Sequence, residues 1–125
     1  MQYNTLGEML RQKRKELGVG HRKMAAMVGI PPTVLFETET GLRYPPDLAH
    51  LGRWADLMGL SKKEKHLMFD LAGKRRGKIA PDLPDYIKPR QYVIDALRIA
   101  RDVGATKKDW GKFAAFVELS KAAET

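Results

Sequence analysis

Apolar side chains recur along most of the chain at the three- and four-residue spacing of helices that bury one face. Leu6, Met9, Leu10 and Leu17 follow this spacing and Gly18 supplies a stop, which predicts a helix of about three turns. Alternation of apolar and polar residues never persists beyond a few positions, so no segment has the pattern of a β-strand. We therefore expect an all-α fold. The same spacing predicts four further helices in the first half, at about residues 21–28, 32–40, 47–58 and 62–72.

The last third of the chain carries two more apolar stripes, separated by Gly104. Residues 91–125 are therefore predicted to form a helical hairpin. Two helices of about three turns cannot bury both stripes on each other alone. We expect the hairpin to pack on the first module or on a second copy of itself, in a dimerisation or regulatory role. The stripes are Val93, Ile94, Leu97 and Ala100 in the first helix, and Trp110, Phe113, Ala114 and Val117 in the second.

Three of the predicted helices begin with a capping box, in which a Ser or Thr is followed three residues later by an acid. Such a pair satisfies backbone N–H groups that a helix start leaves without partners. The pairs are Thr5 with Glu8, Ser61 with Glu64, and Thr106 with Asp109.

Basic residues are concentrated in the middle of the chain. Residues 61–90 hold nine basic and four acidic side chains, and the whole chain has a net charge of +8. Because prolines that break helices follow the basic cluster, we expect residues 74–90 to form a basic linker between a domain at 1–73 and the hairpin. The charge favours an anionic partner such as nucleic acid. The cluster is Lys74, Arg75, Arg76 and Lys78, and the prolines are Pro81, Pro84 and Pro89.

The stretch from His21 to Glu39 has the spacing of a helix-turn-helix motif. Ala25 is small where two helices cross closely, and Gly29 stands at the turn, where a left-handed backbone favours glycine. Ile30 and Leu35 then fill the angle between the helices. Such a turn directs the second helix outward.

These residues resemble the Cro/repressor-type helix-turn-helix family, also called the xenobiotic-response-element family of bacterial and phage regulators. The resemblance covers roughly residues 5–72 and implies a five-helix fold and a dimeric transcription regulator that binds double-stranded DNA. The matching words are Leu10-Arg11-x-x-Arg14-Lys15-Glu16-Leu17-Gly18, then Met24-Ala25-x-x-Val28-Gly29-Ile30, then Glu39-x-Gly41-x-Arg43-x-Pro45, and lastly Leu51-x-x-x-Ala55-x-x-Met58-Gly59-Leu60.

The tail is similar to short C-terminal extensions on prophage and mobile-element regulators. Some of these regulators are encoded beside a zinc metallopeptidase that inactivates them, so the resemblance also implies a regulatory peptidase as a partner. The matching words are Leu71-Ala72-Gly73, Pro81-Asp82-Leu83-Pro84-Asp85-Tyr86-Ile87, Ala96-Leu97-Arg98-x-Ala100-Arg101-Asp102 and Asp109-Trp110.

The chain departs from the family pattern at the DNA-contacting positions. Gly20-His21 replaces the usual Ser/Thr-Gln pair, although His21 still supplies a hydrogen-bond donor for a phosphate. The second helix of the motif offers few base-reading groups: Thr33 can hydrogen-bond, Glu37 can accept from cytosine N4, and apolar side chains can meet thymine methyl groups. Positions that we expect to contact DNA on or near this motif are His21, Arg22, Pro32, Thr33, Val34, Phe36, Glu37 and Arg43, and on the first helix Arg11, Arg14 and Lys15.

Three features of the chain have competing interpretations. The basic face of the first helix and the cluster at 74–78 either contact phosphates, together with Lys23, or are simply solvated. Phe36 is a base contact, an anchor for a partner protein, or a residue buried by a misjudged helix register.

Nothing in the sequence favours an enzyme. Cysteine is absent, which excludes thiolate chemistry and suits a reducing cytosol. His66 and Asp70 have the i,i+4 spacing of two metal ligands, but no third ligand accompanies them, so we expect no metal and no cofactor. No apolar run approaches the roughly 20 residues of a membrane helix and no export segment is visible, so we expect a cytoplasmic protein.

We conclude from the sequence that the chain is a sequence-specific transcriptional regulator, a repressor that binds a palindromic operator as a homodimer. The alternative is a protein-interaction module or an antitoxin, which would use the same fold to bind a toxin, a peptidase or RNA polymerase.

Overall fold

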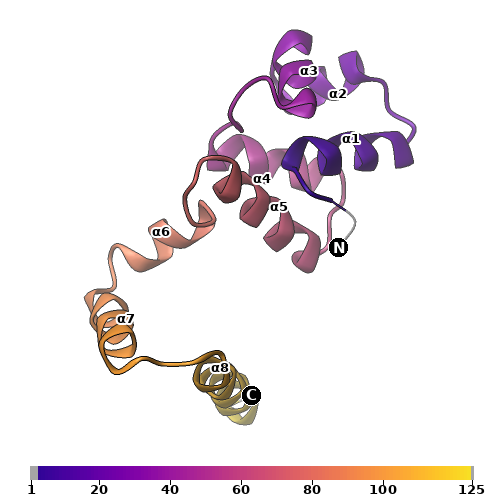
Figure 1. Cartoon of the computed structure of the whole chain (residues 1–125). Helices are drawn as coiled ribbons and strands as arrows, with labels where there is room; N and C mark the ends of the chain where they lie inside the picture. The colour runs from indigo at the N-terminus through magenta and orange to yellow at the C-terminus, as the bar shows by residue number, and fades with distance from the viewer. Residues whose placement is uncertain (1–2, 125) are drawn as a thin grey trace. The chain divides into compact units, whose positions relative to one another are not determined.

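The computed structural model describes residues 3–124, and these residues form helices and no strands (Figure 1). The chain divides after Asp85 into two units, which are described separately. The all-α prediction is confirmed. The helices are α1 (Leu6–Glu16), α2 (His21–Val28), α3 (Pro32–Thr40), α4 (Leu48–Leu57), α5 (Lys62–Arg75), α6 (Asp82–Ile87), α7 (Gln91–Val103) and α8 (Lys107–Glu124).

The bounds of α2 and α3 match the sequence prediction, but the stretch expected as a linker is more ordered than predicted. Helix α5 continues to Arg75, and α6 forms inside residues 74–90. Pro84 does not prevent α6, because it lies in the first turn, where a backbone N–H has no partner within the helix. The described residues therefore contain eight helices where the sequence pattern predicts seven.

The predicted capping residues stand at the helix starts. The Ser61 hydroxyl accepts from the Glu64 backbone N–H at 3.1 Å, and the Glu64 carboxylate accepts from the Ser61 N–H at 2.9 Å. Thr106 and Asp109 make the same reciprocal pair. Thr5 accepts from the Glu8 N–H, but the Glu8 carboxylate accepts from Asn4, one residue before the cap.

One hydrophobic core holds α1 to α5 together in the first unit, with α2 and α3 on one side of it and α4 and α5 on the other (Figure 1). Trp54 belongs to this core and is fully buried. Its indole Nε1 has no hydrogen-bond partner within the described part of the chain. The other largest fully buried side chains are Met9, Leu10, Met24, Val28, Leu35, Leu51 and Met68.

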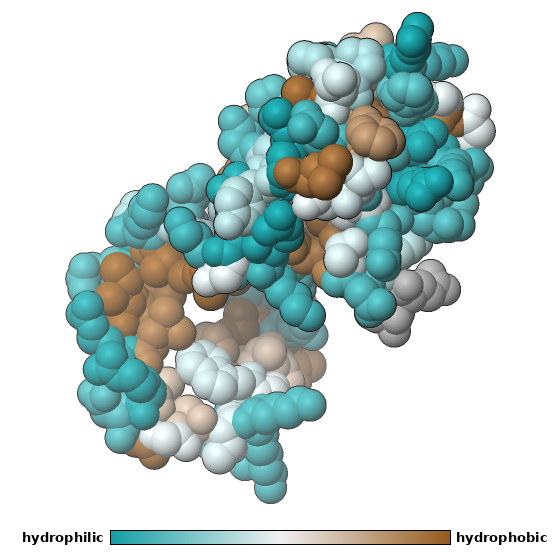
Figure 2. Space-filling model, turned by 45° about the horizontal axis from the view of Figure 1, so that its top comes forward, coloured by the Kyte–Doolittle hydropathy of each residue, from teal (hydrophilic) through white to brown (hydrophobic). Residues whose placement is uncertain are grey.

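The second unit consists mainly of α7 and α8, the two helices that the sequence predicts within residues 91–125. The prediction that they pair as a hairpin is not confirmed, because α7 and α8 make few contacts with each other within the described residues. Gly104 ends α7 with φ 73°, and the Ala105 N–H returns to the Ala100 carbonyl at 2.8 Å, which turns the chain into α8. No residue of either helix is buried within the described chain. Figure 2 shows broad apolar surface on this unit. An apolar surface of this kind is typical of an interaction face.

No helix within residues 3–124 is long and apolar enough to cross a membrane.

Candidate nucleic-acid interface

The turn between α2 and α3 has the geometry that the sequence predicts. Gly29 adopts φ 85°, and the N–H groups of Gly29 and Ile30 both donate to the Ala25 carbonyl, at 2.8 and 3.0 Å. Ala25 and Leu35 are fully buried. Pro31 caps α3 and Pro32 occupies its first turn, where proline is tolerated. Helices α2 and α3 therefore form a rigid helix-turn-helix element.

Helix α3 presents a mixed face to solvent. Pro32, Thr33 and Phe36 are exposed, whereas Val34 and Glu37 are half-buried. Phe36 is 55% exposed, so the interpretation that it is buried by a different register is wrong. The two remaining interpretations of Phe36, a base contact and a protein anchor, both require this exposure.

Glu37 is paired with Arg43 from the loop that follows α3. The Arg43 guanidinium donates to Glu37 Oε1 at 3.3 Å, and both side chains remain partly exposed. This pairing offsets the negative charge that would otherwise repel DNA phosphates. Oε2 of Glu37 stays available to accept a hydrogen bond.

The N-terminus of α2 carries three exposed cationic or donor side chains, His21, Arg22 and Lys23. Gly20 provides no side-chain cap, so the backbone N–H groups of the first turn remain available. Positive side chains beside free N–H groups at a helix start attract phosphate.

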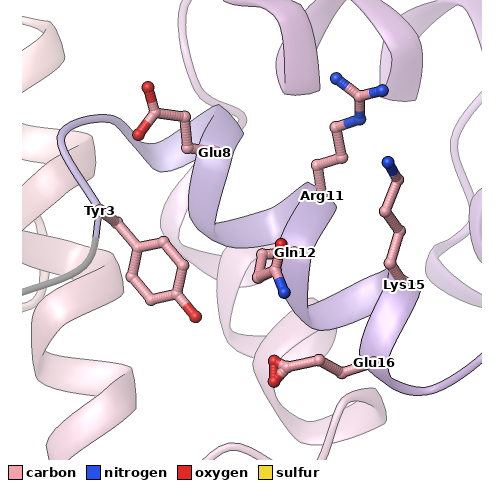
Figure 3. Close-up of a pocket in the computed structure, with 6 residues that line it drawn as sticks. All are labelled: Tyr3, Glu8, Arg11, Gln12, Lys15 and Glu16. Carbon is pink, nitrogen blue, oxygen red and sulfur yellow. The ribbon is translucent and has the colours of Figure 1, made fainter.

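Arg11 and Lys15 lie four residues apart on α1 and extend away from the helix side by side (Figure 3). They border a broad open hollow of about 770 Å³, together with Tyr3, Glu8, Gln12 and Glu16. Both cations are exposed, and neither has an ion-pair partner among residues 3–124. They remain candidates for phosphate contacts.

Arg14 does not belong with them, which corrects the expectation that it contacts phosphate. Its Nε donates to Glu39 Oε2 at 2.7 Å, one terminal nitrogen donates to Glu39 Oε1 at 3.0 Å, and the other donates to the Val19 carbonyl at 3.0 Å. Only 13% of the Arg14 side chain and 6% of the Glu39 side chain are exposed. The Glu39 carboxylate raises the Arg14 pKa. Arg14 therefore joins α1 to α3 and has no free face for DNA.

Lys13 is also engaged in a contact between helices. Its ammonium group pairs with the carboxylate of Glu64 at the start of α5. Hydrogen bonds from Lys13 and from the Ser61 backbone N–H lower the pKa of Glu64 to about 2. The stability that this group contributes is present above its unfolded value, about 4.5, and is lost as the pH falls toward 2.

We expect Lys13→Gln to raise the Glu64 pKa toward its ordinary value, because the hydrogen bond from the Lys13 ammonium group, the largest cause of the shift, is removed. The variant should also lose stability at neutral pH and show a smaller loss between pH 4.5 and 2 than the wild type. An NMR titration of the Glu64 carboxyl carbon measures the pKa directly. Lys65→Gln is the matched control, because Lys65 pairs with Asp56 and not with Glu64. An unchanged Glu64 pKa in Lys13→Gln would contradict the assignment.

Comparisons with solved structures find chains that are similar to this one. No family model and no curated protein matches the chain. The chain is similar to the master regulator for biofilm formation SinR, in a crystal structure in complex with DNA, with a TM-score of 0.47 and 24% identity over 53% of this chain and 100% of that one. It is also similar to a chain in the complex of the SinR and SinI proteins, with a TM-score of 0.48 and 19% identity over 94% of this chain and 99% of that one.

Proposed function

We propose that the chain is a sequence-specific DNA-binding transcriptional regulator and not an enzyme. The observation that carries the proposal is the geometry of the helix-turn-helix element. Helix α3 is held outward by a rigid turn, and its exposed face is accompanied by unpaired cations on α1 and at the start of α2. This arrangement suits a helix that enters the major groove while basic groups on its flanks contact phosphates.

The exposed face of α3 favours apolar base recognition. Phe36 and the exposed edge of Val34 suit the methyl group of thymine, and Thr33 supplies one hydroxyl to a base edge. Glu37 accepts from cytosine N4 with the oxygen that Arg43 leaves free. Affinity then comes mainly from phosphate contacts, for which Arg11, Lys15 and Arg22 are the candidates.

A titration of two duplexes tests the proposal, one with the DNA upstream of the gene and one with a scrambled sequence. A dimer that neutralises about 6 to 10 phosphates should show a slope of log affinity against log salt between about −5 and −9. Specific binding should be at least about 10³-fold tighter to the native duplex. Equal affinity for both duplexes at every salt concentration would rule out a sequence-specific regulator.

We also propose that the regulator acts in the cytoplasm as a homodimer that represses from a palindromic operator. Two copies would place one α3 in each of two successive major grooves, about 34–36 Å apart. Helices α7 and α8 supply a surface for the second copy. Its apolar side chains include Ile99, Val103, Phe116 and Leu119, which are between 65% and 75% exposed within one chain. Its charge is nearly balanced, with six basic and five acidic residues in 91–125, so two copies would not repel strongly.

We expect Phe116→Lys combined with Leu119→Lys to break the dimer, because two cations would have to be buried in an apolar interface. Light scattering coupled to size-exclusion chromatography should then give 14.1 kDa, against twice that mass for the wild type. Glu118→Lys is the matched control: it changes an exposed polar residue of the same helix and should leave the dimer intact. A wild-type chain that stays monomeric at high concentration would overturn the assignment.

A second candidate function is docking on a partner protein, such as a toxin or a regulatory peptidase. It is favoured by the exposed aromatic and aliphatic side chains on and after α3, Phe36, Leu42 and Tyr44, of which Leu42 is 70% exposed.

Phe36→Ala separates the two functions. If α3 reads bases, the variant should lose preference for the native duplex while its binding to scrambled DNA stays unchanged, since phosphate contacts carry no sequence information. If α3 docks on a protein, DNA binding should be unaffected. Thr40→Ala, an exposed polar position near the end of α3, is the control.

A further inference from the structure

The basic cluster at the end of α5 is folded onto the loop that follows α3. The Arg75 guanidinium lies 4.5 Å from the centroid of the Tyr44 ring, and that of Arg76 lies 5.2 Å from it. Arg75 also donates to the Gly41 carbonyl at 3.3 Å, and Arg76 donates to the Pro45 carbonyl at 2.6 Å. Two neighbouring arginines are therefore fixed on one aromatic ring, in a segment that the sequence pattern treats as a linker.

The backbone beneath these arginines is also fixed. Gly77 adopts φ 67°, and the N–H groups of Gly77 and Lys78 return to the carbonyls of Lys74 and Gly73, at 3.0 and 2.8 Å. Gly73 is buried, and a Cβ there would lie 2.8 Å from the Ala80 nitrogen, so the returning chain passes directly against α5. The turn at residues 77–78 therefore fixes the backbone of the two arginines, and Tyr44 contacts their guanidinium groups.

The charge of this pair is not compensated inside the protein. Neither Arg75 nor Arg76 is paired with a carboxylate in the part of the chain that the structure describes, and both are exposed. Each guanidinium has five N–H donors, and the neutral carbonyls use only part of them. Two adjacent cations repel each other in this arrangement, and phosphates bound to them would offset the repulsion.

The position of the pair connects it with the face of α3. Arg76 lines a surface hollow of about 450 Å³ together with Val34, Glu37 and Arg43. The major groove of B-DNA is about 12 Å wide and is bordered by phosphates on both sides. A helix that turns Val34 and Glu37 toward base edges therefore brings the neighbouring Arg76 toward the backbone at the edge of the groove.

We propose that Arg75 and Arg76, held by Tyr44, form a binding site for backbone phosphates of duplex DNA beside the groove that α3 enters, each arginine taking one phosphate. This inference rests on the proposed DNA-binding function. Tyr44 is a positioning residue, because its ring fixes the guanidinium groups before DNA arrives and so lowers the entropy lost on binding. Planar guanidinium groups with several free donors suit phosphate oxygens.

The test measures the affinity of the full chain for the native and the scrambled duplex between 50 and 200 mM salt. Each phosphate contact contributes about 0.9 to the slope of log affinity against log salt, so Arg75→Gln with Arg76→Gln should make the slope shallower by nearly 2 per bound subunit. Over this salt range the wild type should lose about tenfold more affinity per subunit than the variant. The loss should be equal for the two duplexes, because the contacts are with the backbone.

Lys62→Gln with Lys63→Gln is the matched control. It removes the same charge from exposed positions at the other end of α5 and should change the slope by much less. The single variants Arg75→Gln and Arg76→Gln each test the site with half the expected effect, which keeps the test valid if the double variant unfolds. Tyr44→Ala should weaken DNA binding and Tyr44→Phe, which keeps the ring, should restore it.

The outcomes separate this inference from the proposed function. In one outcome the wild type binds DNA, and the arginine variants change the slope of log affinity against log salt no more than the lysine control does. This would show that Arg75 and Arg76 only stabilise the loop, and it would overturn the phosphate site alone. A second outcome is equal affinity for both duplexes with a steep salt dependence that the arginine variants make shallower. It would support the phosphate site but contradict a sequence-specific regulator. A wild-type chain that binds neither duplex would overturn both.

Discussion

Replacing Gly7 with alanine should destabilise the first unit by about 3 kcal/mol, the upper part of the range for overpacked sites. Gly7 lies in α1 where the helix touches the C-terminal end of α3. A Cβ there would lie 2.8 Å from the Glu39 carbonyl carbon and 2.9 Å from the Thr38 carbonyl oxygen, with the Glu39 oxygen closer still. These are backbone atoms, which cannot rotate away as a side chain would. The two helices must therefore separate, and separation opens the core.

The same substitution should weaken DNA binding more than its stability effect alone explains, because the displaced backbone belongs to α3. Urea denaturation measures the free energy of unfolding, and duplex titration under conditions where the variant is folded measures the affinity. Gly52→Ala is the matched control: Gly52 lies inside α4 with open space at its Cβ position, so alanine there should stabilise the chain by about 0.5–1 kcal/mol. Equal effects of the two substitutions would contradict the close contact between α1 and α3.

The helix-turn-helix element could be predicted from the sequence because local signals specify it. Gly29 and Gly41 adopt φ 85° and 79° directly after the last residues of α2 and α3, and the prolines at 31 and 32 fix the start of α3. Each signal lies within a few residues of the boundary that it sets. The burial of Ala25 and Leu35 and the exposure of Phe36 then follow from helical spacing.

The contacts that decide which cations are free could not be predicted in this way. Arg14 and Glu39 are 25 residues apart, and Arg76 and the Pro45 carbonyl are 31 apart. A basic residue on a helix face has the same local pattern whether it is solvated, paired within the protein or available to phosphate. Only the packing of α1 against α3, and of the end of α5 against the loop after α3, distinguishes these cases. The position of α6 was missed for a related reason, since Pro84 indicates a break unless the register that puts it in a first turn is known.

The Arg14–Glu39 pair carries the second large effect. We expect Glu39→Gln to cost about 3 kcal/mol, near the lower end for breaking a buried ion pair, because Arg14 keeps its hydrogen bond to the Val19 carbonyl. Arg14→Gln should cost a similar amount, since it leaves a nearly buried carboxylate without its partner. Thermal or urea denaturation of both single variants and the double variant gives the coupling energy, which we expect to be about 2 kcal/mol.

Arg43→Gln is the comparison for this pair, because the Arg43–Glu37 pair joins two partly exposed side chains and should contribute less than about 1 kcal/mol. Arg14 and Arg43 should also differ in their effect on DNA binding. Arg14→Gln should reduce affinity only through the position of α3, so that the slope against salt is unchanged, because Arg14 has no face toward phosphate. A shallower slope in a folded Arg14→Gln chain would show that Arg14 contacts the DNA backbone after all, and that its bond with Glu39 opens when DNA binds.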